Sequence, residues 1–242
     1  MRQEANRVGL FPKKVFLVSA KNKENLSELI AYLDQNSRDR DVYFVGTTNV
    51  GKSTLINAII DQMGDIQNLI TTSRFPGTTL DKIEIPLANG HSLVDTPGII
   101  TENQLATRLN AQELSIISPQ KQLKPVTFQL SSGNTLFLAG LGRVDFLKGE
   151  KASFTVYAAR GLYIHRTKTE NADSFYDKHL GELLNPPSQS DELPPLKWQE
   201  YHTKEKSDLL LGGIGFVTVP ANCLVRVYTP GQIGLGIRRA LI

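Results

Sequence analysis

Apolar positions in the first hundred residues are grouped in two ways. Residues 15–18 and 42–45 are continuous apolar runs, typical of strands buried on both faces of a parallel sheet. Residues 24–35 instead place four apolar side chains at helical spacing. The order predicts a strand, a helix and a second strand, the right-handed crossover unit of an α/β domain. Beyond this unit the pattern predicts a helix over 54–61, strands at 83–85 and 92–94, and a helix over about 103–117.

The pattern changes after residue 125. Short alternating runs separated by glycine and proline indicate antiparallel strands at 127–130, 135–138, 153–157, 162–165, 215–219 and 224–228. An amphipathic helix is predicted over 172–184, and the four prolines of 185–195 indicate a loop. The fold class expected is therefore an α/β domain with a mostly parallel sheet over residues 1–118, followed by a β-rich domain with one or two helices over residues 119–242.

The composition excludes several classes of protein. With 242 residues, 40% of them hydrophobic and 21% charged, the chain is an ordinary globular protein. No apolar run reaches the roughly 18 residues of a membrane span, and no signal peptide is evident, so no membrane partner and a cytoplasmic location are expected. The single cysteine, Cys223, excludes an internal disulfide and a cysteine cluster for zinc.

Charge is unevenly distributed although the net charge is only +3. Residues 1–100 are neutral, whereas residues 119–168 hold two acidic residues and eight basic ones: Lys121, Lys124, Arg143, Lys148, Lys151, Arg160, Arg166 and Lys168. The segment also holds aromatic side chains at Phe128, Phe137, Phe146, Tyr157 and Tyr163. Exposed, these rings could stack on bases while the cations neutralise phosphates, and the alternative is that the rings belong to the core. The basic residues alone predict a surface that faces RNA.

Residues 46–53, Gly-Thr-Thr-Asn-Val-Gly-Lys-Ser, fit the phosphate-binding loop pattern. Successive backbone N–H groups of such a loop wrap a phosphate, Lys52 supplies a cation to the β- and γ-phosphates, and the Ser53 hydroxyl binds Mg²⁺. The context also fits, because a buried strand precedes the loop and a helix follows it.

Two further segments match this loop. Asp95-Thr-Pro-Gly98 follows the strand at 92–94, where the Asp95 carboxylate could hold a Mg²⁺-bound water and the Gly98 N–H could sense the γ-phosphate. Pro76-Gly-Thr-Thr79 lies between the two, and the Thr79 hydroxyl could complete the Mg²⁺ shell. Lys52, Thr79 and Gly98 are therefore the candidate catalytic residues.

The motif order is unusual and leads to a family. The three segments resemble the G1, G2 and G3 motifs of translation-factor-class GTPases, while Ser19-Ala20-Lys21 looks like the guanine-contacting G5 motif placed before G1, as in circularly permuted GTPases. The chain closely resembles the YqeH family of ribosome-assembly GTPases through Thr-Asn-Val-Gly-Lys-Ser-Thr at 48–54, Thr-Thr-Ser-Arg-Phe-Pro-Gly-Thr-Thr-Leu-Asp at 71–81, Asp-Thr-Pro-Gly-Ile-Ile at 95–100, His-Arg-Thr-Lys at 165–168 and Gly-Glu-Leu-Leu-Asn-Pro-Pro at 181–187.

The resemblance implies a permuted GTPase domain and a β-rich domain acting in maturation of the small (30S) ribosomal subunit. Its expected partners are GTP or GDP, the small subunit and its rRNA. The nucleotide-binding residues expected from it are Ser19, Ala20, Lys21, Thr48, Asn49, Val50, Gly51, Lys52, Ser53, Thr54, Asp95 and Gly98. Mg²⁺ is expected at Ser53 and Thr79, with Asp95 acting through water.

Two features of the family are missing from the sequence. The zinc finger with its paired cysteines is absent, and so is the G4 motif Asn-Lys-x-Asp, so the chain is expected to be an N-terminally truncated fragment. One alternative function is therefore an RNA-binding assembly module that binds no nucleotide or hydrolyses none. A P-loop ATPase or kinase is disfavoured by the paired segments at 76–79 and 95–98.

The water-orienting residue of hydrolysis is also unusual. Many GTPases carry a glutamine after Asp-x-x-Gly, but Ile99 and Ile100 stand here and cannot hydrogen-bond a nucleophile. In related GTPases an asparagine at the position of Asn49 coordinates K⁺ where an arginine finger would lie. The expectation is slow hydrolysis stimulated by K⁺. The alternative is that Asn49 only stabilises its loop through hydrogen bonds.

Overall fold

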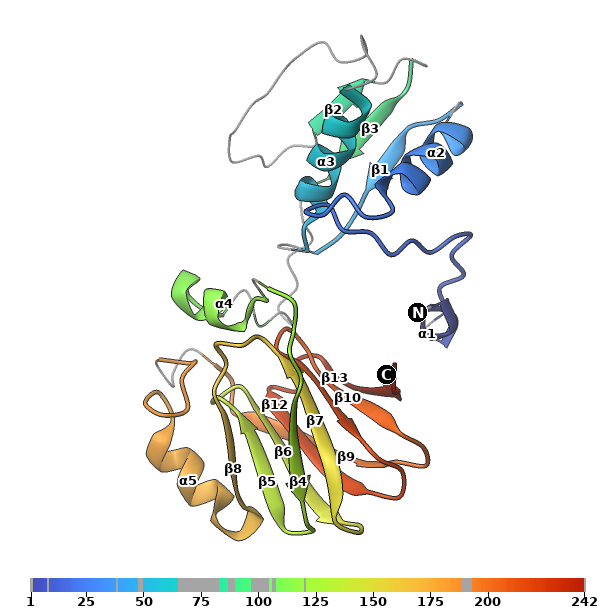
Figure 1. Cartoon of the computed structure of the whole chain (residues 1–242). Helices are drawn as coiled ribbons and strands as arrows, with labels where there is room; N and C mark the ends of the chain where they lie inside the picture. The colour runs from blue at the N-terminus through green and yellow to red at the C-terminus, as the bar shows by residue number, and fades with distance from the viewer. Residues whose placement is uncertain are drawn as a thin grey trace. The chain divides into compact units, whose positions relative to one another are not determined.

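The computed structural model describes residues 2–7, 9–37, 39–47, 50–64, 83–86, 90–96, 105, 108–119, 121–188 and 193–241. The chain divides into two compact units, Met1–Thr101 and Glu102–Ile242 (Figure 1). This division comes earlier than the 118/119 boundary expected from the sequence. Helix α4 (Ala111–Ile117) therefore falls in the second unit, where Ile117 is buried in the same cluster as the β-strands.

The first unit holds a three-stranded sheet in the order β1-β3-β2. Strands β1 (Val42–Phe44) and β3 (Ser92–Asp95) are parallel, whereas β2 (Ile83–Pro86) is antiparallel to β3. The prediction of a mostly parallel sheet is wrong. Because only residues 87–91 separate β2 from β3, the connection is too short for a crossover, which needs a dozen or more residues.

Helices α2 (Leu26–Asn36) and α3 (Lys52–Gly64) bury their apolar faces in one small core, together with Leu93 of β3. The Gln62 side-chain amide of α3 donates to the Ser27 hydroxyl of α2 at 2.7 Å, which links the two helices. A short helix, α1 (Arg2–Arg7), precedes them. Among the described helices, none is both long and apolar enough to cross a membrane.

Residues 15–18, predicted as a buried strand, do not form one. Leu17 is 67% exposed, and the nearest ladder-like pairing is a single bridge between Ser19 and Glu24. Within the described residues no strand lies beside this run to accept its N–H groups, and an apolar run becomes a strand only when a partner satisfies its backbone. The predicted strand–helix–strand unit therefore lacks its first strand.

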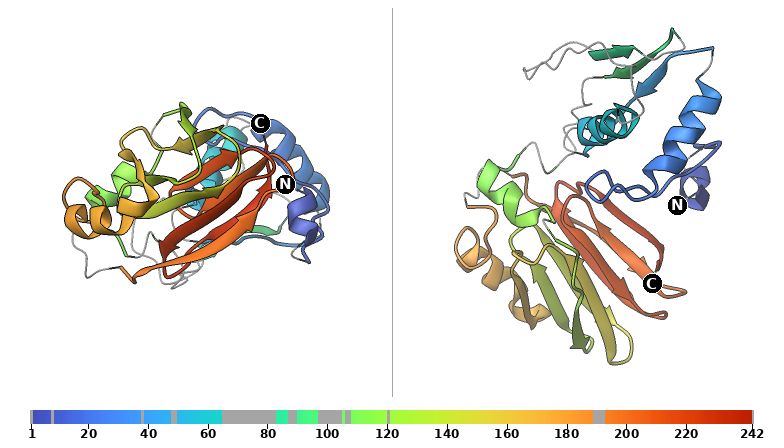
Figure 2. Two further views of the ribbon diagram at one scale, coloured as in Figure 1. Left: turned by 90° about the horizontal axis from the view of Figure 1, so that it is seen from below. Right: turned by 45° about the horizontal axis from the view of Figure 1, so that its top comes forward.

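The second unit consists of two five-stranded antiparallel sheets (Figures 1 and 2), which confirms the predicted β-rich C-terminal region. One sheet has the order β13-β10-β11-β7-β4, and the other β8-β5-β6-β12-β9. Their bounds are β4 (Val126–Leu130), β5 (Asn134–Leu138), β6 (Gly142–Lys148), β7 (Ala152–Ala158), β8 (Ile164–Lys168), β9 (Leu196–His202), β10 (Ser207–Leu211), β11 (Gly215–Val219), β12 (Leu224–Pro230) and β13 (Leu235–Arg239). Inward-facing apolar residues of both sheets form the largest core, where the Phe146 and Phe154 rings lie 4.9 Å apart.

Helix α5 (Ala172–His179), preceded by the 3₁₀ turn η2 (Thr169–Asn171), covers the outer face of β5 and β8. It ends five residues before the predicted end at 184. Leu180 is already extended, and the N–H of Leu184 donates back to the carbonyl of His179 at 2.9 Å, closing a turn.

Helix α4 is anchored to the second unit by a buried carboxylate. Asn110 caps the helix in a capping box with Glu113, and Glu113 Oε1 also accepts from the N–H and the hydroxyl of Ser188, each at 2.6 Å. Burial by itself raises the pKa of the Glu113 carboxyl, but its hydrogen bonds with Ser188 and with the Asn110 N–H outweigh burial and hold that pKa below its ordinary value. The helix predicted for 103–117 thus begins at its cap, at residue 111.

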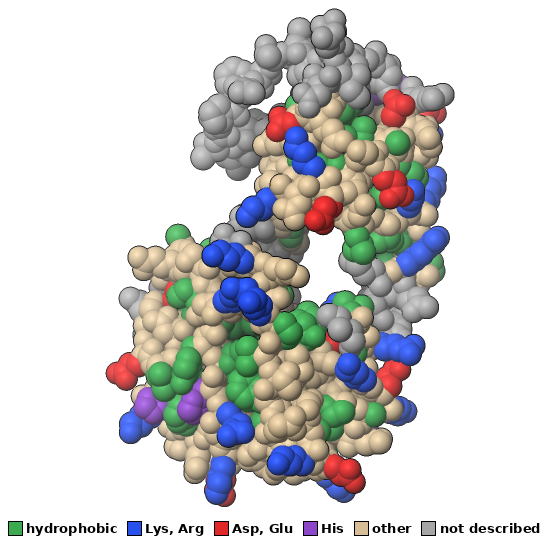
Figure 3. Space-filling model, in the orientation of Figure 1, with side chains coloured by type: hydrophobic (Ala, Val, Ile, Leu, Met, Phe, Trp, Pro, Cys, Tyr) green, Lys and Arg blue, Asp and Glu red, His purple; other side chains and the backbone are tan. Residues whose placement is uncertain are grey.

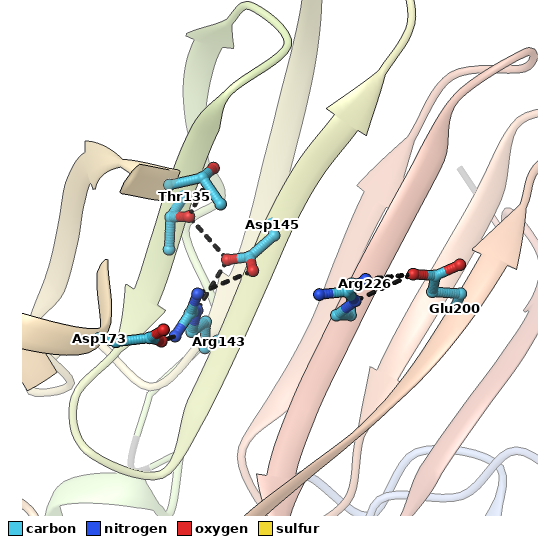
Figure 4. Close-up of polar contacts among 7 residues, drawn as sticks. Thr135, Arg143, Asp145, Asp173, Glu200 and Arg226 are labelled. Carbon is cyan, nitrogen blue, oxygen red and sulfur yellow. Dashed lines mark hydrogen bonds and ion pairs between the residues drawn. The ribbon is translucent and has the colours of Figure 1, made fainter. Parts of the chain in front are cut away.

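Two ion pairs on the outer face of the β8-β5-β6-β12-β9 sheet differ in burial (Figure 4). The Arg143 guanidinium makes two bonds to Asp145, at 2.7 and 2.9 Å, and contacts Asp173 of α5. The Asp145 carboxylate also accepts from the Thr135 hydroxyl at 2.6 Å, and its side chain is 1% exposed. In contrast, Arg226 bonds Glu200 at 2.5 and 3.0 Å, with both side chains about one-third exposed.

Candidate nucleotide-binding site

A cluster of charged and hydroxyl groups lies at the carboxyl ends of the parallel strands β1 and β3. Asp95 is the last residue of β3 and pairs in register with Phe44, the last of β1. The Lys52 ammonium, at the start of α3, contacts the Asp95 carboxylate and the Thr96 carbonyl oxygen. The Ser53 hydroxyl donates to the other oxygen of Asp95 at 2.9 Å. The structure thus brings together three residues that the sequence placed in one site.

This ion pair is shielded from solvent, because the Lys52 and Asp95 side chains are each only 11% exposed. An ion pair at such a position is screened less by salt than one on the surface. Lys52 balances the carboxylate in this conformation, and its ammonium is positioned at the strand ends, where ligands bind to open α/β sheets.

The loop before α3 requires glycine at Gly51 and leaves a tight fit for a side chain at Gly46. Gly51 has φ of +86°, which side chains rarely adopt, and its carbonyl accepts the N–H of Leu55 at 2.8 Å to begin the helix. A Cβ on Gly46 would come within 3.2 Å of a Val50 methyl group. The first turn of α3 holds no acidic residue, so its free N–H groups and the helix dipole favour an anion.

Thr96 belongs to this site and escaped the sequence analysis. Its hydroxyl donates to the Phe44 carbonyl at 2.8 Å, its N–H donates to the same oxygen at 3.3 Å, and its own carbonyl contacts Lys52. Thr96 thereby joins the ends of β1 and β3. The sequence feature that could have indicated this role is the position of Thr96 directly after Asp95 in the Asp-Thr-Pro-Gly segment.

The donor atoms present fit a magnesium ion. The Ser53 hydroxyl and the Asp95 carboxylate, 2.9 Å apart, are the hard oxygen ligands that Mg²⁺ prefers, and they lie beside the helix N-terminus where phosphates bind. When bound, Mg²⁺ would neutralise charge on phosphate oxygens. Thr79, the third expected ligand, lies outside the described residues, as do Thr48, Asn49 and Gly98.

The remaining predicted residues lie around the site or apart from it. Val50 and Thr54 are exposed. Ser19, Ala20 and Lys21 form a turn that leads into α2, in which the Ser19 hydroxyl accepts from the Asn22 N–H at 3.2 Å. Ala20 packs against the core shared by α2 and α3, while Lys21 is exposed. The contact of this turn with a guanine base stays a prediction.

The basic segment 119–168 does not form one surface. Arg143 is buried in its ion pairs and is no part of an RNA-facing surface, because Asp145 and Asp173 neutralise it. Because β4 and β7 are antiparallel with Val126 opposite Val156, Lys121, Lys124 and Arg160 lie at one end of the sheet, near α4. The strand ends and turns at the opposite end carry Lys148, Lys151 and Lys168. Figure 3 shows basic side chains at both ends of this unit.

The aromatic residues of the same segment are mostly core. Phe137 and Phe146 are fully buried, so the core alternative is correct for both. Phe128 packs against the main core, whereas Tyr157 lies outside that core, half-buried on the other face of β7, and stacks on Phe216 at 4.6 Å between centroids. Tyr163 differs from these, because it is 40% exposed.

A loop of phosphate-binding sequence between β1 and α3, joined through Lys52 and Ser53 to the aspartate of the next parallel strand, is the arrangement of P-loop nucleotide-binding proteins. Residues 41–132 match the family model described as 50S ribosome-binding GTPase, and residues 151–241 match the model described as YqeH-like, C-terminal. The chain belongs to the YqeH family. It is 48% identical to the uncharacterized protein YqeH of Bacillus subtilis, over all of this chain and 67% of that protein.

More distant relatives share less of their length with this chain. The NO-associated protein 1 of Arabidopsis thaliana is 30% identical over 85% of this chain and 43% of its own length. A GTPase Der of Buchnera aphidicola is 30% identical over 59% of this chain and 30% of its own. The chain therefore spans about two thirds of the Bacillus protein and less than half of the plant protein. The GTPase family supports GTP binding, and its members in general hydrolyse GTP and normally use Mg²⁺.

Proposed function

We propose that this chain binds GTP, hydrolyses it slowly and acts as a switch during assembly of the small ribosomal subunit. The observation that carries the nucleotide part of the proposal is the cluster of Lys52, Ser53 and Asp95 at the carboxyl ends of β1 and β3. A carboxylate, a hydroxyl and an ammonium at a helix N-terminus are the groups that hold a metal-bound triphosphate.

Each group has a distinct role in this proposal. Lys52 exchanges the Asp95 carboxylate for the β- and γ-phosphate oxygens and stabilises the negative charge on them. Ser53 and Thr79 would hold Mg²⁺ directly and Asp95 would hold it through water, while the Gly98 N–H would read the γ-phosphate. Thr96 positions the strand ends through its two bonds to the Phe44 carbonyl.

In this proposal a K⁺ ion supplies the positive charge that an arginine finger supplies in other GTPases. Asn49 would hold K⁺, and Ile99 leaves no side chain there to orient the attacking water. GTP hydrolysis by the full chain is expected to be faster in KCl than in NaCl at equal ionic strength, and Asn49→Ala should remove this difference. Phosphate release measured in the two salts checks the prediction. Equal rates in the two salts, or an unchanged K⁺ response in the variant, would refute it.

The ribosomal part of the proposal rests on the family resemblance and on the basic residues of the second unit. The matched GTPase family is described by its binding to the 50S ribosome, whereas the resemblance from the sequence implies the small subunit. Sedimentation of the full chain with separated 30S and 50S subunits, in GDP and in a non-hydrolysable GTP analogue, decides between them. The proposal expects association with 30S particles that changes with the nucleotide. Association with 50S alone would contradict it.

Nucleotide titration tests the proposal most directly. With labelled GDP, GTP and ATP in the presence of Mg²⁺, the full chain is expected to bind guanine nucleotides with a dissociation constant in the micromolar range and to bind ATP much more weakly. Fluorescence anisotropy measures all three. An absence of binding would favour the RNA-binding module without nucleotide, and a preference for ATP would favour a P-loop ATPase or kinase.

A further inference from the structure

The start of β8 carries a series of stacked rings that ends in an exposed tyrosine. The His165 ring lies parallel to the Phe175 ring of α5, with centroids 4.2 Å apart and 3° between the planes. Tyr163 stacks on the His165 ring at 6.0 Å, and its hydroxyl lies 3.3 Å from Nδ1 of that ring. The backbone is held as well, because the Tyr163 carbonyl accepts the N–H of Ala139 at 2.7 Å. The Tyr163 ring is thus held in place before any ligand arrives.

The loop that carries this tyrosine holds one arginine and lies against α4. A Cβ on Gly161 would lie 3.6 Å from the Ile116 carbonyl, so the loop between β7 and β8 contacts the last turn of α4. Arg160 is exposed in this loop, and Lys121 and Lys124 are exposed in the segment that leads from α4 into β4. Residues 114–144, which hold Lys121 and Lys124, and residues 151–169, which hold Arg160, contain no aspartate or glutamate, so these cations have no acidic neighbour along their own segments.

The opposite end of the sheets differs in charge. Lys148 and Lys151 flank Glu150 in the sequence, and Lys168 pairs with Glu170 at 3.3 Å. The Arg166 guanidinium donates to the Gln129 carbonyl at 3.3 Å. Acidic neighbours and internal bonds therefore offset the basic charge at that end, and the ring series is absent from its described residues.

We propose that Tyr163, with Arg160, Lys121 and Lys124, forms a contact site for single-stranded RNA, in which a base stacks on the Tyr163 ring and the three cations bind the flanking phosphates. The site deepens the ribosomal part of the proposed function and rests on it. Unpaired bases stack on aromatic side chains held in fixed orientations, whereas the bases of a duplex are already stacked on one another. The site therefore selects single strands over duplexes.

Binding of labelled RNA to the full chain tests the site. The probe is a single-stranded RNA of about 12 nucleotides and mixed sequence, a length within the range that one single-strand-binding domain covers, and a duplex of equal length is the comparison. The single strand is expected to bind more tightly. Tyr163→Ala should weaken its binding about 5- to 100-fold, and Tyr163→Phe should stay within about twofold of the wild type because it keeps the ring.

Two matched controls separate this site from general basic binding. Trp198→Ala removes a ring of comparable exposure beside Glu200, and its RNA affinity should be unchanged. In a plot of log binding constant against log salt concentration, the double variant Lys121→Ala and Lys124→Ala should have a shallower slope, by about 0.7 for each phosphate that is no longer neutralised. The double variant Lys148→Ala and Lys151→Ala should leave this slope unchanged.

The outcomes distinguish this site from the proposed switch. RNA binding that Tyr163→Ala leaves intact, that Trp198→Ala weakens equally, or that favours the duplex overturns the site. If Tyr163→Ala loses association with the ribosomal subunit but keeps its RNA binding, the RNA site is also overturned, because Tyr163 then contacts a ribosomal protein and not RNA. If the wild type binds no RNA, the inference fails, while nucleotide titration of the same sample reports separately whether the GTP switch stands.

Discussion

Replacing Lys52 by alanine is expected to lower the rate of GTP hydrolysis by about 10²- to 10³-fold, the usual cost of removing one positioned donor to developing charge. The physical reason is twofold. The variant loses the cation for the β- and γ-phosphates. It also removes the ammonium that neutralises the Asp95 carboxylate, whose side chain is 11% exposed, so an incoming triphosphate meets an unbalanced negative charge. Single-turnover hydrolysis and nucleotide titration measure the two consequences.

The matched control is Lys13→Ala, which removes the same charge from an exposed position of the same unit. Its hydrolysis rate and its GTP affinity should equal those of the wild type. If both variants lose activity to the same extent, the effect comes from net charge and not from the position of Lys52. If neither variant does, Lys52 is not the phosphate-binding lysine, and the proposed nucleotide site is wrong.

Replacing Asp145 by alanine is expected to lower the free energy of unfolding of the second unit by about 3–5 kcal/mol, the usual cost of breaking a buried pair from one side. The Arg143 side chain is 6% exposed, and the variant would leave it with Asp173, whose side chain is 87% exposed, as its remaining described acidic partner, beside the Phe137 and Tyr228 rings. The Thr135 hydroxyl would lose its acceptor as well. Urea unfolding followed by the fluorescence of Trp198, the single tryptophan, measures the change in this unit.

Glu200→Ala is the matched control on the same face of the same sheet. It breaks an Arg–carboxylate pair in which two guanidinium nitrogens share one Glu200 oxygen, and because Arg226 and Glu200 are 30% and 38% exposed, solvent compensates and the expected loss is at most about 1 kcal/mol. Equal losses in the two variants would show that burial does not control the strength of these pairs. A loss below about 1 kcal/mol for Asp145→Ala would show that Arg143 finds another partner or water.

The candidate phosphate-binding site is predictable from the sequence because its signals are local. A loop that wraps a phosphate needs glycine at particular backbone angles, and Gly51 with φ of +86° meets that need within a few residues of Lys52 and Ser53. The partner carboxylate was found through Asp95 at the end of an apolar strand, and the parallel pairing of β1 with β3 brought the two together. Thr96 escaped because its role is a bond to Phe44, a residue distant in sequence.

The errors of sequence analysis arose where a partner decides the outcome. Residues 15–18 have the apolar pattern of a strand, but no described strand pairs with them, so they form no regular element. The apolar pattern does not predict strand β6, because Arg143 and Asp145 interrupt it, although each neutralises the other when buried. The sequence predicts one basic surface over residues 119–168, but the chain folds back at the turns and divides its lysines between two ends of a sheet.

Sequence alone determined the family and the β-rich second half, and it named the candidate phosphate-binding loop and the carboxylate that the structure places beside it. Tertiary structure alone decided that the sheet of the first unit is mixed, that α4 belongs to the second unit, and which charges are buried. The physical reason is the range of the interactions. Backbone angles and strand or helix periodicity are set by neighbouring residues, whereas burial, pairing and neutralisation depend on side chains brought together from distant parts of the chain.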